Sequence, residues 1–311
     1  MRYYIGIDSG GTKTDSVLFD GIGRVLCRRS DSGCNPYDIG IDASKTKLLT
    51  IINQLLELSP EIVTSVFAGV AGLADFGPEF SEYLKEKTGI ANLSAGSDAI
   101  PLINSAFDKS DGCCVISGTG VCCFVRRGGV IRRIGGWGYM LDGGGSGYDL
   151  GRDAIAAALH EYDGQGEQTV LTGLLTTRMG AHPRELLQNI YQGGRAYVAS
   201  FADVVFEGCR LGDSVSIEIM NRNAEAVARM IKVASRENGH IYSVALGGGV
   251  FRHNPEFSSR LRELVSGRIK LMLNTMPAVY GAALEAVNIS GNQIPHGFRD
   301  NFSASYNNIG I

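Results

Sequence analysis

Ile5-Gly6-Ile7-Asp8-Ser9-Gly10-Gly11-Thr12-Lys13-Thr14 opens the sequence, where a short apolar strand ends at Asp8 and enters a turn with two adjacent glycines. Backbone amides that no side chain obstructs can point at a polyphosphate. A carboxylate at the end of a strand can hold a magnesium ion directly or through its waters. A plain hairpin turn is the alternative. We predict a phosphate-binding turn with Asp8 as metal ligand, and with nucleotide contacts from Asp8, Gly10, Gly11, Thr12, Lys13 and Thr14.

A second turn of the same kind is Ser117-Gly118-Thr119-Gly120, which also follows a strand and also combines two glycines with two hydroxyls. It too could be an ordinary hairpin turn. Two such turns at equivalent places favour a nucleotide that is held from two sides. The triplet Gly247-Gly248-Gly249 follows a further strand and could pack closely over a flat adenine or ribose. We predict nucleotide contacts from Ser117, Gly118, Thr119, Gly120, Gly247, Gly248 and Gly249.

The two turns head two similar series of strands. Residues 3–29 are typical of an antiparallel three-stranded meander, and helices and strands then alternate up to residue 107. The pattern restarts with strands over 112–134, continues with helices over most of 148–238, and adds a strand at 241–246 and a helix near 277–287. We predict an α/β protein with two lobes, 1–110 and 111–311. The residues after Gly291 are not assigned to any element.

Asp98 ends one predicted strand and begins the next helix. Aspartate at such a position can cap the helix by accepting hydrogen bonds from its first amides. Phosphoryl transfer to an alcohol, however, also needs a carboxylate within hydrogen-bond reach of the attacking hydroxyl. The two roles can coexist, and we predict that Asp98 is the catalytic base and contacts the substrate.

Two further segments have the composition of a sugar site. Asn35 lies in a loop before a proline, where its amide can serve turn chemistry or hydrogen-bond to sugar hydroxyls. Gly135-Gly136-Trp137-Gly138 contains the only tryptophan of the chain. A tryptophan is often a core residue, but one flanked by glycines can form the wall of a ligand site. We predict substrate contacts from Asn35, Gly136, Trp137 and Gly138.

Composition excludes several classes of partner. The 311 residues carry 29 basic and 32 acidic side chains, a net charge of -3, and no basic block, which argues against nucleic acid or an anionic membrane as partner. No apolar run approaches membrane-spanning length, and the first residues do not form a secretory signal. The seven cysteines include no Cys-x-x-Cys pair. We therefore expect a cytoplasmic protein with reduced thiols.

Taken together, these residues resemble the BadF/BadG/BcrA/BcrD-type ATPase family, and within it the N-acetylglucosamine kinases. The resemblance spans residues 3 to about 287 and rests on the opening stretch, on Ile116-Ser117-Gly118-Thr119-Gly120, and on Gly135-Gly136-Trp137-Gly138 through Ser146-Gly147-Tyr148. It implies a duplicated ribonuclease-H-like fold of the actin and sugar-kinase type, with ATP, Mg²⁺ and a sugar in the cleft between two lobes, and a homodimer.

The resemblance also implies roles for single residues. Asp98 matches the base that takes the proton from the primary hydroxyl of the sugar. Asn35 and Gly136-Trp137-Gly138 match sugar contacts, while Thr12 and Thr119 match phosphate contacts and the region of Gly248 matches the adenosine site.

One stretch departs from the family pattern. Members usually follow Gly-Trp-Gly with Gly-Asp-Glu-Gly-Ser, whose acidic residues touch the sugar, but this chain has Leu141-Asp142-Gly143-Gly144-Gly145-Ser146. A carboxylate hydrogen bond to a hydroxyl contributes about 1.5–3 kcal/mol, so the missing glutamate could change the preferred sugar or weaken catalysis. We predict that Asp142 still contacts the sugar through the flexible triglycine.

The sequence therefore predicts an ATP-dependent kinase of the primary 6-hydroxyl of an amino sugar. N-acetylglucosamine is the expected substrate, or a related hexosamine such as N-acetylmuramic acid or glucosamine. One alternative is an ATPase activator of a CoA-ester reductase or dehydratase, which would carry an iron–sulfur cluster on exposed thiolates. The other alternative is a regulator that binds ATP without catalysis. The activator is disfavoured because the cysteine pairs at 113–114 and 122–123 lie in apolar strands.

Overall fold

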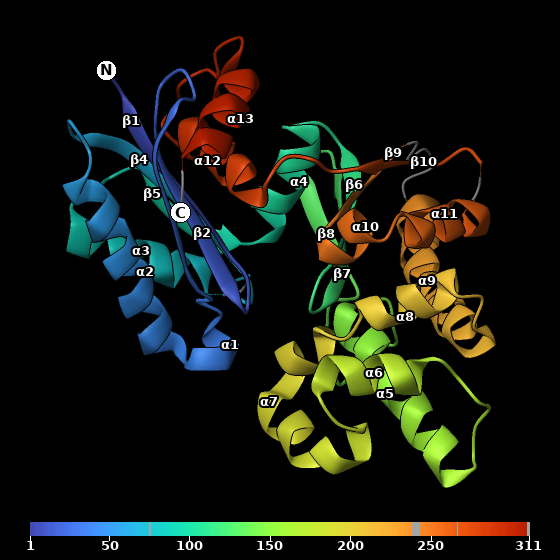
Figure 1. The fold of residues 1–311 in the computed structure, drawn as a ribbon. Helices are drawn as coiled ribbons and strands as arrows, with labels where there is room; N and C mark the ends of the chain where they lie inside the picture. The colour runs from blue at the N-terminus through green and yellow to red at the C-terminus, as the bar shows by residue number, and fades with distance from the viewer. Residues whose placement is uncertain (75, 238–242, 266, 310–311) are drawn as a thin grey trace. The chain divides into compact units, whose positions relative to one another are not determined.

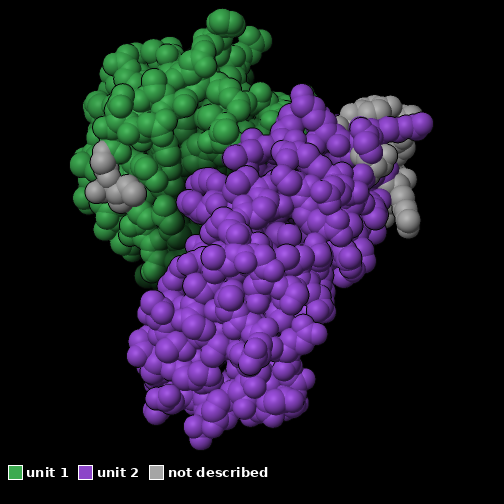
Figure 2. Space-filling model, turned by 45° about the vertical axis from the view of Figure 1, so that its right-hand side comes forward, with its two compact units in different colours: residues 1–110, 275–311 green, residues 111–274 purple. Residues whose placement is uncertain are grey.

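The structure is a computed structural model that describes residues 1–74, 76–237, 243–265 and 267–309. The contacts within it divide the chain into two units (Figure 2). Unit 1 consists of Met1–Ser110 together with Thr275–Ile311, and unit 2 consists of Asp111–Asn274. The boundary after residue 110 is where the sequence placed it. The expected second lobe of 111–311 is too long, because Thr275–Ile311 packs within unit 1.

Unit 1 is built on a five-stranded sheet in the order β3-β2-β1-β4-β5. Neighbouring pairs β3/β2 and β2/β1 are antiparallel, whereas β1/β4 and β4/β5 are parallel. The strands are β1 (Tyr3–Ser9), β2 (Lys13–Asp20), β3 (Val25–Ser32), β4 (Val63–Val70) and β5 (Leu93–Ser97). The helices are α1 (Pro36–Ile39), α2 (Ile41–Glu57), α3 (Gly77–Thr88), α4 (Ala99–Phe107), α12 (Ala278–Ile289) and α13 (Phe298–Asn308).

Side chains along β1 point alternately to the two faces of this sheet, so that each face is covered by different helices. Ile5 and Ile7 are fully buried and share a hydrophobic cluster with the apolar stripe of α2, which comprises Leu48, Ile51, Ile52 and Leu55. Tyr4 points to the opposite face and belongs to a second cluster with α12 and α13. Figure 1 accordingly shows α2 and α3 on one side of the sheet and α12 and α13 on the other.

This second cluster explains why the C-terminal segment belongs to unit 1. Helix α12 is apolar on most of its surface and packs against β1, β4 and α4, so separating it from unit 1 would expose its buried residues. Helix α13 was not predicted. Its Phe298, Phe302 and Tyr306 recur every four residues, a helical spacing that is visible in the sequence. Phe298 and Phe302 pack edge-on against Phe19, and Tyr306 stacks on Phe302.

Unit 2 repeats the topology of unit 1, with the strand order β10-β9-β6-β7-β8. β6/β7 and β7/β8 are antiparallel, and β6/β9 and β9/β10 are parallel. The strands are β6 (Gly112–Ser117), β7 (Val121–Arg127), β8 (Val130–Ile134), β9 (Ser243–Gly247) and β10 (Lys270–Leu273). The α-helices are α5 (Gly147–Asp163), α6 (Leu171–Met179), α7 (Leu187–Ala199), α8 (Asp203–Arg210), α9 (Ser214–Glu237), α10 (Gly249–His253) and α11 (Pro255–Leu264).

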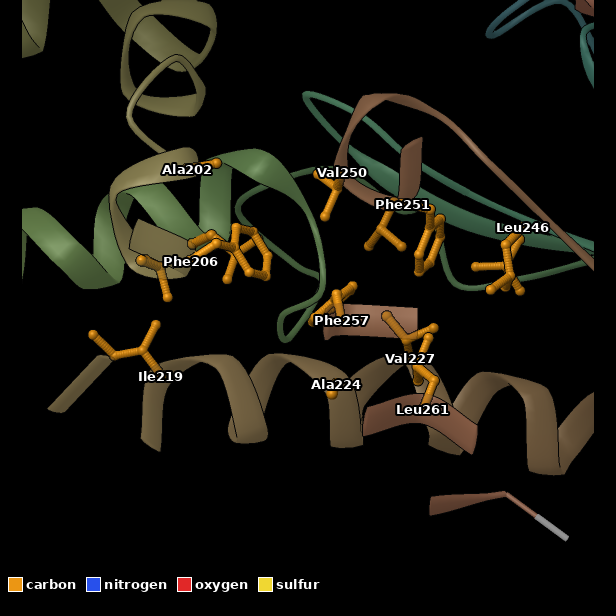
Figure 3. Close-up of a cluster of buried hydrophobic side chains, with 14 of the residues drawn as sticks. Ala202, Phe206, Ile219, Ala224, Val227, Leu246, Val250, Phe251, Phe257 and Leu261 are labelled. Atoms are coloured by element: carbon orange, nitrogen blue, oxygen red, sulfur yellow. The ribbon is translucent and has the colours of Figure 1, made fainter. Parts of the chain in front are cut away.

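The core of unit 2 joins its sheet to several of these helices. Figure 3 shows Phe206 of α8, Val227 of α9, and Phe257 and Leu261 of α11 in one hydrophobic cluster with Leu246 of β9, with Phe206 next to Phe257. The prediction of a second meander followed by helices is confirmed. Residues 241–242, where the strand after α9 was expected to begin, lie outside the described residues. In the part of the chain that the structure describes, no helix combines the length and apolarity needed to cross a membrane.

Candidate active site

The first glycine turn, residues 9–13, joins β1 to β2 at the carboxyl end of β1. Gly10 N–H donates to the carbonyl of Lys13 (2.8 Å), and Gly33 N–H donates to the carbonyl of Thr12 (3.1 Å). Gly33 packs so closely on the backbone of this turn that a Cβ on Gly33 would collide with the carbonyl oxygens of Gly10 and Gly11. Backbone contacts therefore fix the shape of the turn, and Thr12 and Lys13 remain exposed.

Thr14 lies on the inner side of the same turn. Its side chain is fully buried, its hydroxyl donates to the carbonyl of Ser32 (2.9 Å), and it is 2.7 Å from the hydroxyl of Ser9. Ser9 in turn accepts from Cys34 N–H (2.9 Å). The structure thus places Thr14 where it supports the turn from within unit 1.

Asp8 lies in an acidic environment at the end of β1. Burial, followed by the negative charges of Asp98 and Asp15, raises its pKa from 3.8 to about 8, while Lys13 acts in the opposite direction. Asp15 faces Asp8 across the β1–β2 ladder. Its carboxylate also accepts from the Arg28 guanidinium (3.2 Å). Asp15 was not among the predicted site residues, because it lies outside the glycine turn and only the pairing of β1 with β2 brings it opposite Asp8.

Asp98 lies between β5 and α4, at the same carboxyl edge of the sheet as Asp8. It occupies the N-cap position of α4, yet its side chain makes no capping hydrogen bond to that helix. Its backbone N–H donates to the carbonyl of Val70 (3.3 Å), and the Ser97 hydroxyl donates to its Oδ1 (3.3 Å). Asp98 thus occupies the position of a helix cap, but its carboxylate makes no capping hydrogen bond to α4. The helix-cap interpretation of this side chain is therefore not supported.

Asn35 caps the short helix α1, where its Oδ1 accepts from Tyr37 N–H (3.0 Å). The same oxygen lies against Gly72, just beyond the end of β4. Because Ala71 N–H donates to the carbonyl of Ser9 (2.8 Å), this segment is tied to the end of β1. Unit 1 therefore gathers Asp8, Asn35 and Asp98 along one edge of its sheet, as parallel strands with a shared carboxyl edge allow.

The second glycine turn, residues 117–120, holds the equivalent place in unit 2. Gly118 N–H donates to the carbonyl of Gly120 (2.9 Å), and Gly147 N–H donates to the carbonyl of Gly118 (2.7 Å). Ser117 is fully buried and its hydroxyl donates to the carbonyl of Gly145 (2.6 Å), so this hydroxyl is engaged within unit 2. Thr119 is partly exposed at the tip of the turn.

The glycine triplet 247–249 adjoins this turn. β9 ends at Gly247, and α10 begins at Gly249. Gly248 packs directly on the backbone of Ser117, so that no side chain would fit between them. Unit 2 therefore brings together two segments that were predicted to contact the nucleotide and that are more than a hundred residues apart in the chain.

The Trp137 loop, residues 135–144, leads from β8 towards α5. Trp137 is 61% exposed, and the Arg133 guanidinium carbon lies 4.1 Å above its ring centroid. Asp142 accepts from Gly138 N–H through Oδ2 (3.0 Å) and so closes the loop on itself. Tryptophan is thus no core residue here, and Asp142 has one oxygen committed to the loop backbone.

The sequence profile of the BadF/BadG/BcrA/BcrD ATPase family matches residues 5–286. The chain belongs to this family.

Its relatives include several sugar kinases. An N-acetylmuramic acid/N-acetylglucosamine kinase from Clostridium acetobutylicum is 29% identical over 310 residues, which cover 92% of this chain and 98% of the relative. An N-acetyl-D-glucosamine kinase from Dictyostelium discoideum is 28% identical over 315 residues, with the same coverage of 92% and 98%. A solved structure from Chromobacterium violaceum, described as a candidate N-acetylglucosamine kinase, matches with a TM-score of 0.71 at 23% identity and covers 91% of this chain and 98% of that chain. The fold is therefore the duplicated ribonuclease-H-like fold of the actin type, as predicted.

The sequence predicts a Mg²⁺ ligand at Asp8, and the oxygen ligands available around Asp8 show whether the site suits this ion. Among the residues that the structure describes, no three His, Cys, Asp or Glu side chains form a metal-binding group. Mg²⁺ is usually held by one or two carboxylates, together with water and substrate phosphates. Asp8 suits that role, because its carboxyl lies among two other acidic charges that a cation would offset.

The cysteines of β6 and β7 bear on the activator alternative. Cys113 and Cys123 are fully buried with their sulfurs 3.5 Å apart. Burial raises the pKa of Cys114, and the hydrogen bond to Cys113 and burial raise that of Cys123. Cluster ligation requires thiolates, so these positions are poorly suited to hold iron and sulfur.

Proposed function

We propose that the chain is an ATP-dependent kinase that phosphorylates the 6-hydroxyl of an amino sugar, with N-acetylglucosamine, N-acetylmuramic acid or glucosamine as substrate. The observation that carries the proposal is the position of the Asp98 carboxylate, which follows β5 at the same carboxyl edge of the sheet as Asp8 and whose charge acts on the Asp8 carboxyl. Membership of an ATPase family and the amino-sugar kinases among its relatives support the same reading.

In this proposal each unit contributes a different part of the chemistry. Asp98 accepts the proton of the attacking hydroxyl, which makes the oxygen a better nucleophile as it approaches the γ-phosphorus. Asn35, Trp137 and Asp142 are the proposed contacts of the sugar. Bound magnesium supplies charge neutralisation on the phosphates, and Asp8 is the residue that would hold it.

The two glycine turns hold the nucleotide phosphates in the same proposal. Exposed Thr12 and Lys13 and the amides of Gly10 and Gly11 serve the first turn, and Gly118, Thr119 and Gly120 serve the second. Thr14 and Ser117 act from beneath the turns, where their hydroxyls hold the backbone in place. The triplet 247–249 receives the adenosine. We also propose that the enzyme acts in the cytoplasm, as a homodimer.

The test is ADP release measured by a coupled assay over a panel of N-acetylglucosamine, N-acetylmuramic acid, glucosamine, N-acetylmannosamine and glucose. We expect at least one amino sugar to stimulate ADP release, and its 6-deoxy analogue to bind without turnover. Absence of sugar-stimulated release across the panel would overturn the kinase proposal. An increase of the thermal midpoint by ATP without turnover would then point to a non-catalytic ATP-binding regulator, and a brown, air-sensitive protein would point to the activator.

Asp98→Asn tests the role of the base directly. A general base contributes about 10²–10⁴-fold, so kcat should fall by that factor while the affinity for ATP is retained. The amide oxygen of an asparagine at this position can still accept from the Ser97 hydroxyl, so we expect the free energy of unfolding to change by less than about 1 kcal/mol. Asp42→Asn, in the exposed first turn of α2, is the matched control and should leave both quantities unchanged. Full activity of Asp98→Asn would refute the assignment.

A further inference from the structure

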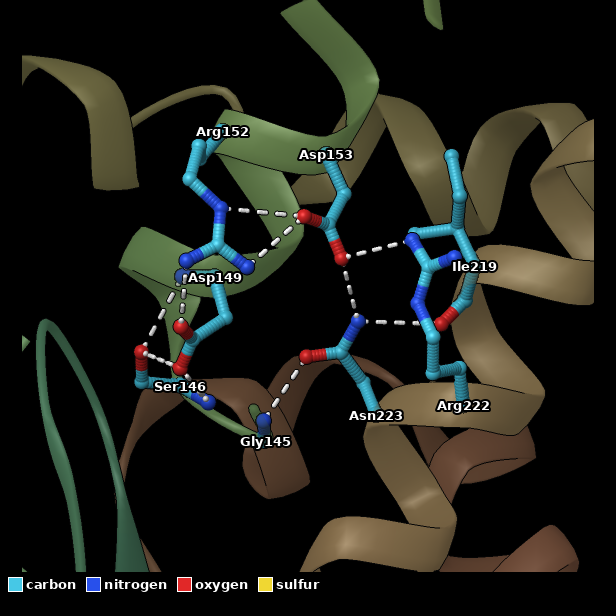
Figure 4. Close-up of polar contacts among 8 residues, drawn as sticks. All are labelled: Gly145, Ser146, Asp149, Arg152, Asp153, Ile219, Arg222 and Asn223. Carbon is cyan, nitrogen blue, oxygen red and sulfur yellow. Dashed lines mark hydrogen bonds and ion pairs between the residues drawn. The ribbon is translucent and has the colours of Figure 1, made fainter. Parts of the chain in front are cut away.

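A buried amide on α9 holds Gly145, the residue at which the end of the Trp137 loop meets the second glycine turn. Figure 4 shows Asn223 between Gly145 and Asp153. Gly145 N–H donates to Asn223 Oδ1 (2.7 Å), and Asn223 Nδ2 donates to Asp153 Oδ2 (3.1 Å) and to the carbonyl of Ile219 (3.0 Å). Asn223 is 1% exposed. Its amide group is therefore used on both sides, away from solvent.

Gly145 occupies a special place in the chain. Its carbonyl accepts from the Ser117 hydroxyl (2.6 Å), which belongs to the second glycine turn, while its N–H is held by Asn223. The residues immediately before it form the Trp137 loop. One peptide segment is thus fixed by the second glycine turn on one side and by α9 on the other.

The backbone of Gly145 leaves little freedom for an alternative arrangement. Its φ is +100°, a conformation that favours glycine, and a Cβ at this position would collide with Val227. Directly after it, Ser146 and Asp149 form a capping box at the start of α5, and Gly147 N–H donates to the carbonyl of Gly118. Two hydrogen bonds, from Ser117 to Gly145 and from Gly147 to Gly118, therefore join the end of the Trp137 loop to the second glycine turn.

The acidic end of this network is also fixed. Asp153 accepts from Arg152 (2.8 Å) and from Arg222 (3.0 Å), and both arginines are about half exposed. Arg152 donates to Oδ1 of Asp153 and Arg222 donates to Oδ2, and these contacts orient Oδ2 towards the Asn223 amide. Asn223 is consequently held with its oxygen directed at Gly145, and this orientation is what its role requires.

We propose that Asn223 is a positioning residue that couples the Trp137 loop to the second glycine turn, so that sugar and ATP each strengthen the binding of the other. The inference rests on the proposed function, which assigns the loop to the sugar and the turn to the nucleotide. Coupling of this kind is reciprocal and typically amounts to about 5–150-fold in affinity. Asn223 contacts neither ligand and acts through Gly145.

The chain provides a matched control for this residue. Asn254 is 3% exposed, and its Nδ2 donates to the carbonyl four residues earlier, Val250 (3.0 Å), and to an aspartate, Asp203 (3.3 Å). It therefore reproduces the donor contacts of Asn223 within the same unit. Because Asn254 has no bond to Gly145, the loss of a buried amide can be separated from the loss of the coupling.

The experiment measures the Kd of a non-hydrolysable ATP analogue, with magnesium, in the absence and presence of the saturating sugar that the activity panel identifies. The ratio of the two values is the coupling factor. We expect a coupling factor of about 5 or more in the native protein and a factor near 1 in Asn223→Ala. The Asn254→Ala variant should have the same coupling factor as the native protein. We also expect kcat of Asn223→Ala to fall by about 10–100-fold, because small displacements of reacting groups have large effects on rate.

A paired exchange covers the possibility that Asn223→Ala fails to fold. Asn223→Asp keeps an acceptor for Gly145 but places a carboxylate against Asp153, which should abolish the coupling. Adding Asp153→Asn returns a donor to that contact and should restore it. Such a restoration would show that the coupling depends on the hydrogen bond between positions 223 and 153.

Three outcomes would overturn the inference. The first is a coupling factor of 1 in a native protein that phosphorylates sugar. The second is a coupling factor in Asn223→Ala that equals the native value, and the third is a loss of coupling in Asn254→Ala as large as that in Asn223→Ala. Failure of the proposed function is a different result, in which the native protein shows no sugar-stimulated ADP release.

Discussion

Asp8→Asn should weaken the dependence of thermal stability on pH between pH 5 and pH 7 in metal-free protein. In the unfolded chain the Asp8 carboxyl titrates near pH 4, whereas in the folded protein its pKa is raised to about 8. Between these values the folded state holds a proton that the unfolded state has released. The free energy of unfolding of the native protein therefore falls as the pH rises through this window.

The size of the effect follows from the same linkage. One full proton corresponds to about 1.4 kcal/mol per pH unit, so the interval from pH 5 to pH 7 has an upper limit of about 3 kcal/mol. Solvent at this partly exposed carboxyl reduces the expected contribution to about 1–2 kcal/mol. For a domain of this size, that corresponds to about 2–8 °C in Tm. Asparagine cannot ionise, so the variant lacks this contribution.

The assay is thermal unfolding followed by circular dichroism in EDTA-containing buffers at pH 5, 6 and 7. We expect the Tm difference, variant minus native, to become more positive with rising pH. Asp98→Asn should remove part of the same slope, because the charge of Asp98 is the second cause of the raised pKa. Asp42→Asn should run parallel to the native protein. Parallel lines for Asp8→Asn and the native protein would refute the reasoning.

Two further predictions concern the glycine turn and the exposed tryptophan. Gly33→Ala should weaken ATP binding and lower the free energy of unfolding by about 1–3 kcal/mol, because its Cβ would press on the carbonyls of Gly10 and Gly11. Gly173→Ala is the control, because a Cβ at this position in α6 meets open space, and it should leave the free energy of unfolding unchanged or raise it. Chemical denaturation measures both variants, and an equal decrease in the free energy of unfolding for the two would contradict the prediction. Trp137→Ala should raise the KM for the sugar by about tenfold, leave the KM for ATP unchanged, and lower stability by no more than about 1 kcal/mol, the contribution of its contact with Arg133. Steady-state kinetics with an unchanged KM for the sugar would remove Trp137 from the proposed site.

The sequence alone was sufficient for the features that depend on neighbouring residues. Strand alternation, helical periodicity and glycine punctuation act over a few residues, and they located both meanders, both glycine turns and the junction at Asp98. The exposed Trp137 was also anticipated from its flanking glycines. Because each unit repeats one strand order, these local signals were enough to predict two copies of one α/β topology, whereas the ribonuclease-H-like fold was implied by the family resemblance.

Only the tertiary structure decided the features that join distant residues. The burial of α12 against β1 assigns the C-terminal segment to unit 1, and no local pattern states which sheet an apolar helix will cover. Asp98 had the sequence of a helix cap, and only side-chain geometry showed that its carboxylate makes no capping bond. The raised pKa of Asp8 depends on residues brought beside it by folding, and the bond from Gly145 to Asn223 spans 78 positions of the chain. Such contacts arise from packing between elements that are distant in the chain, and the residues around one partner do not identify the other.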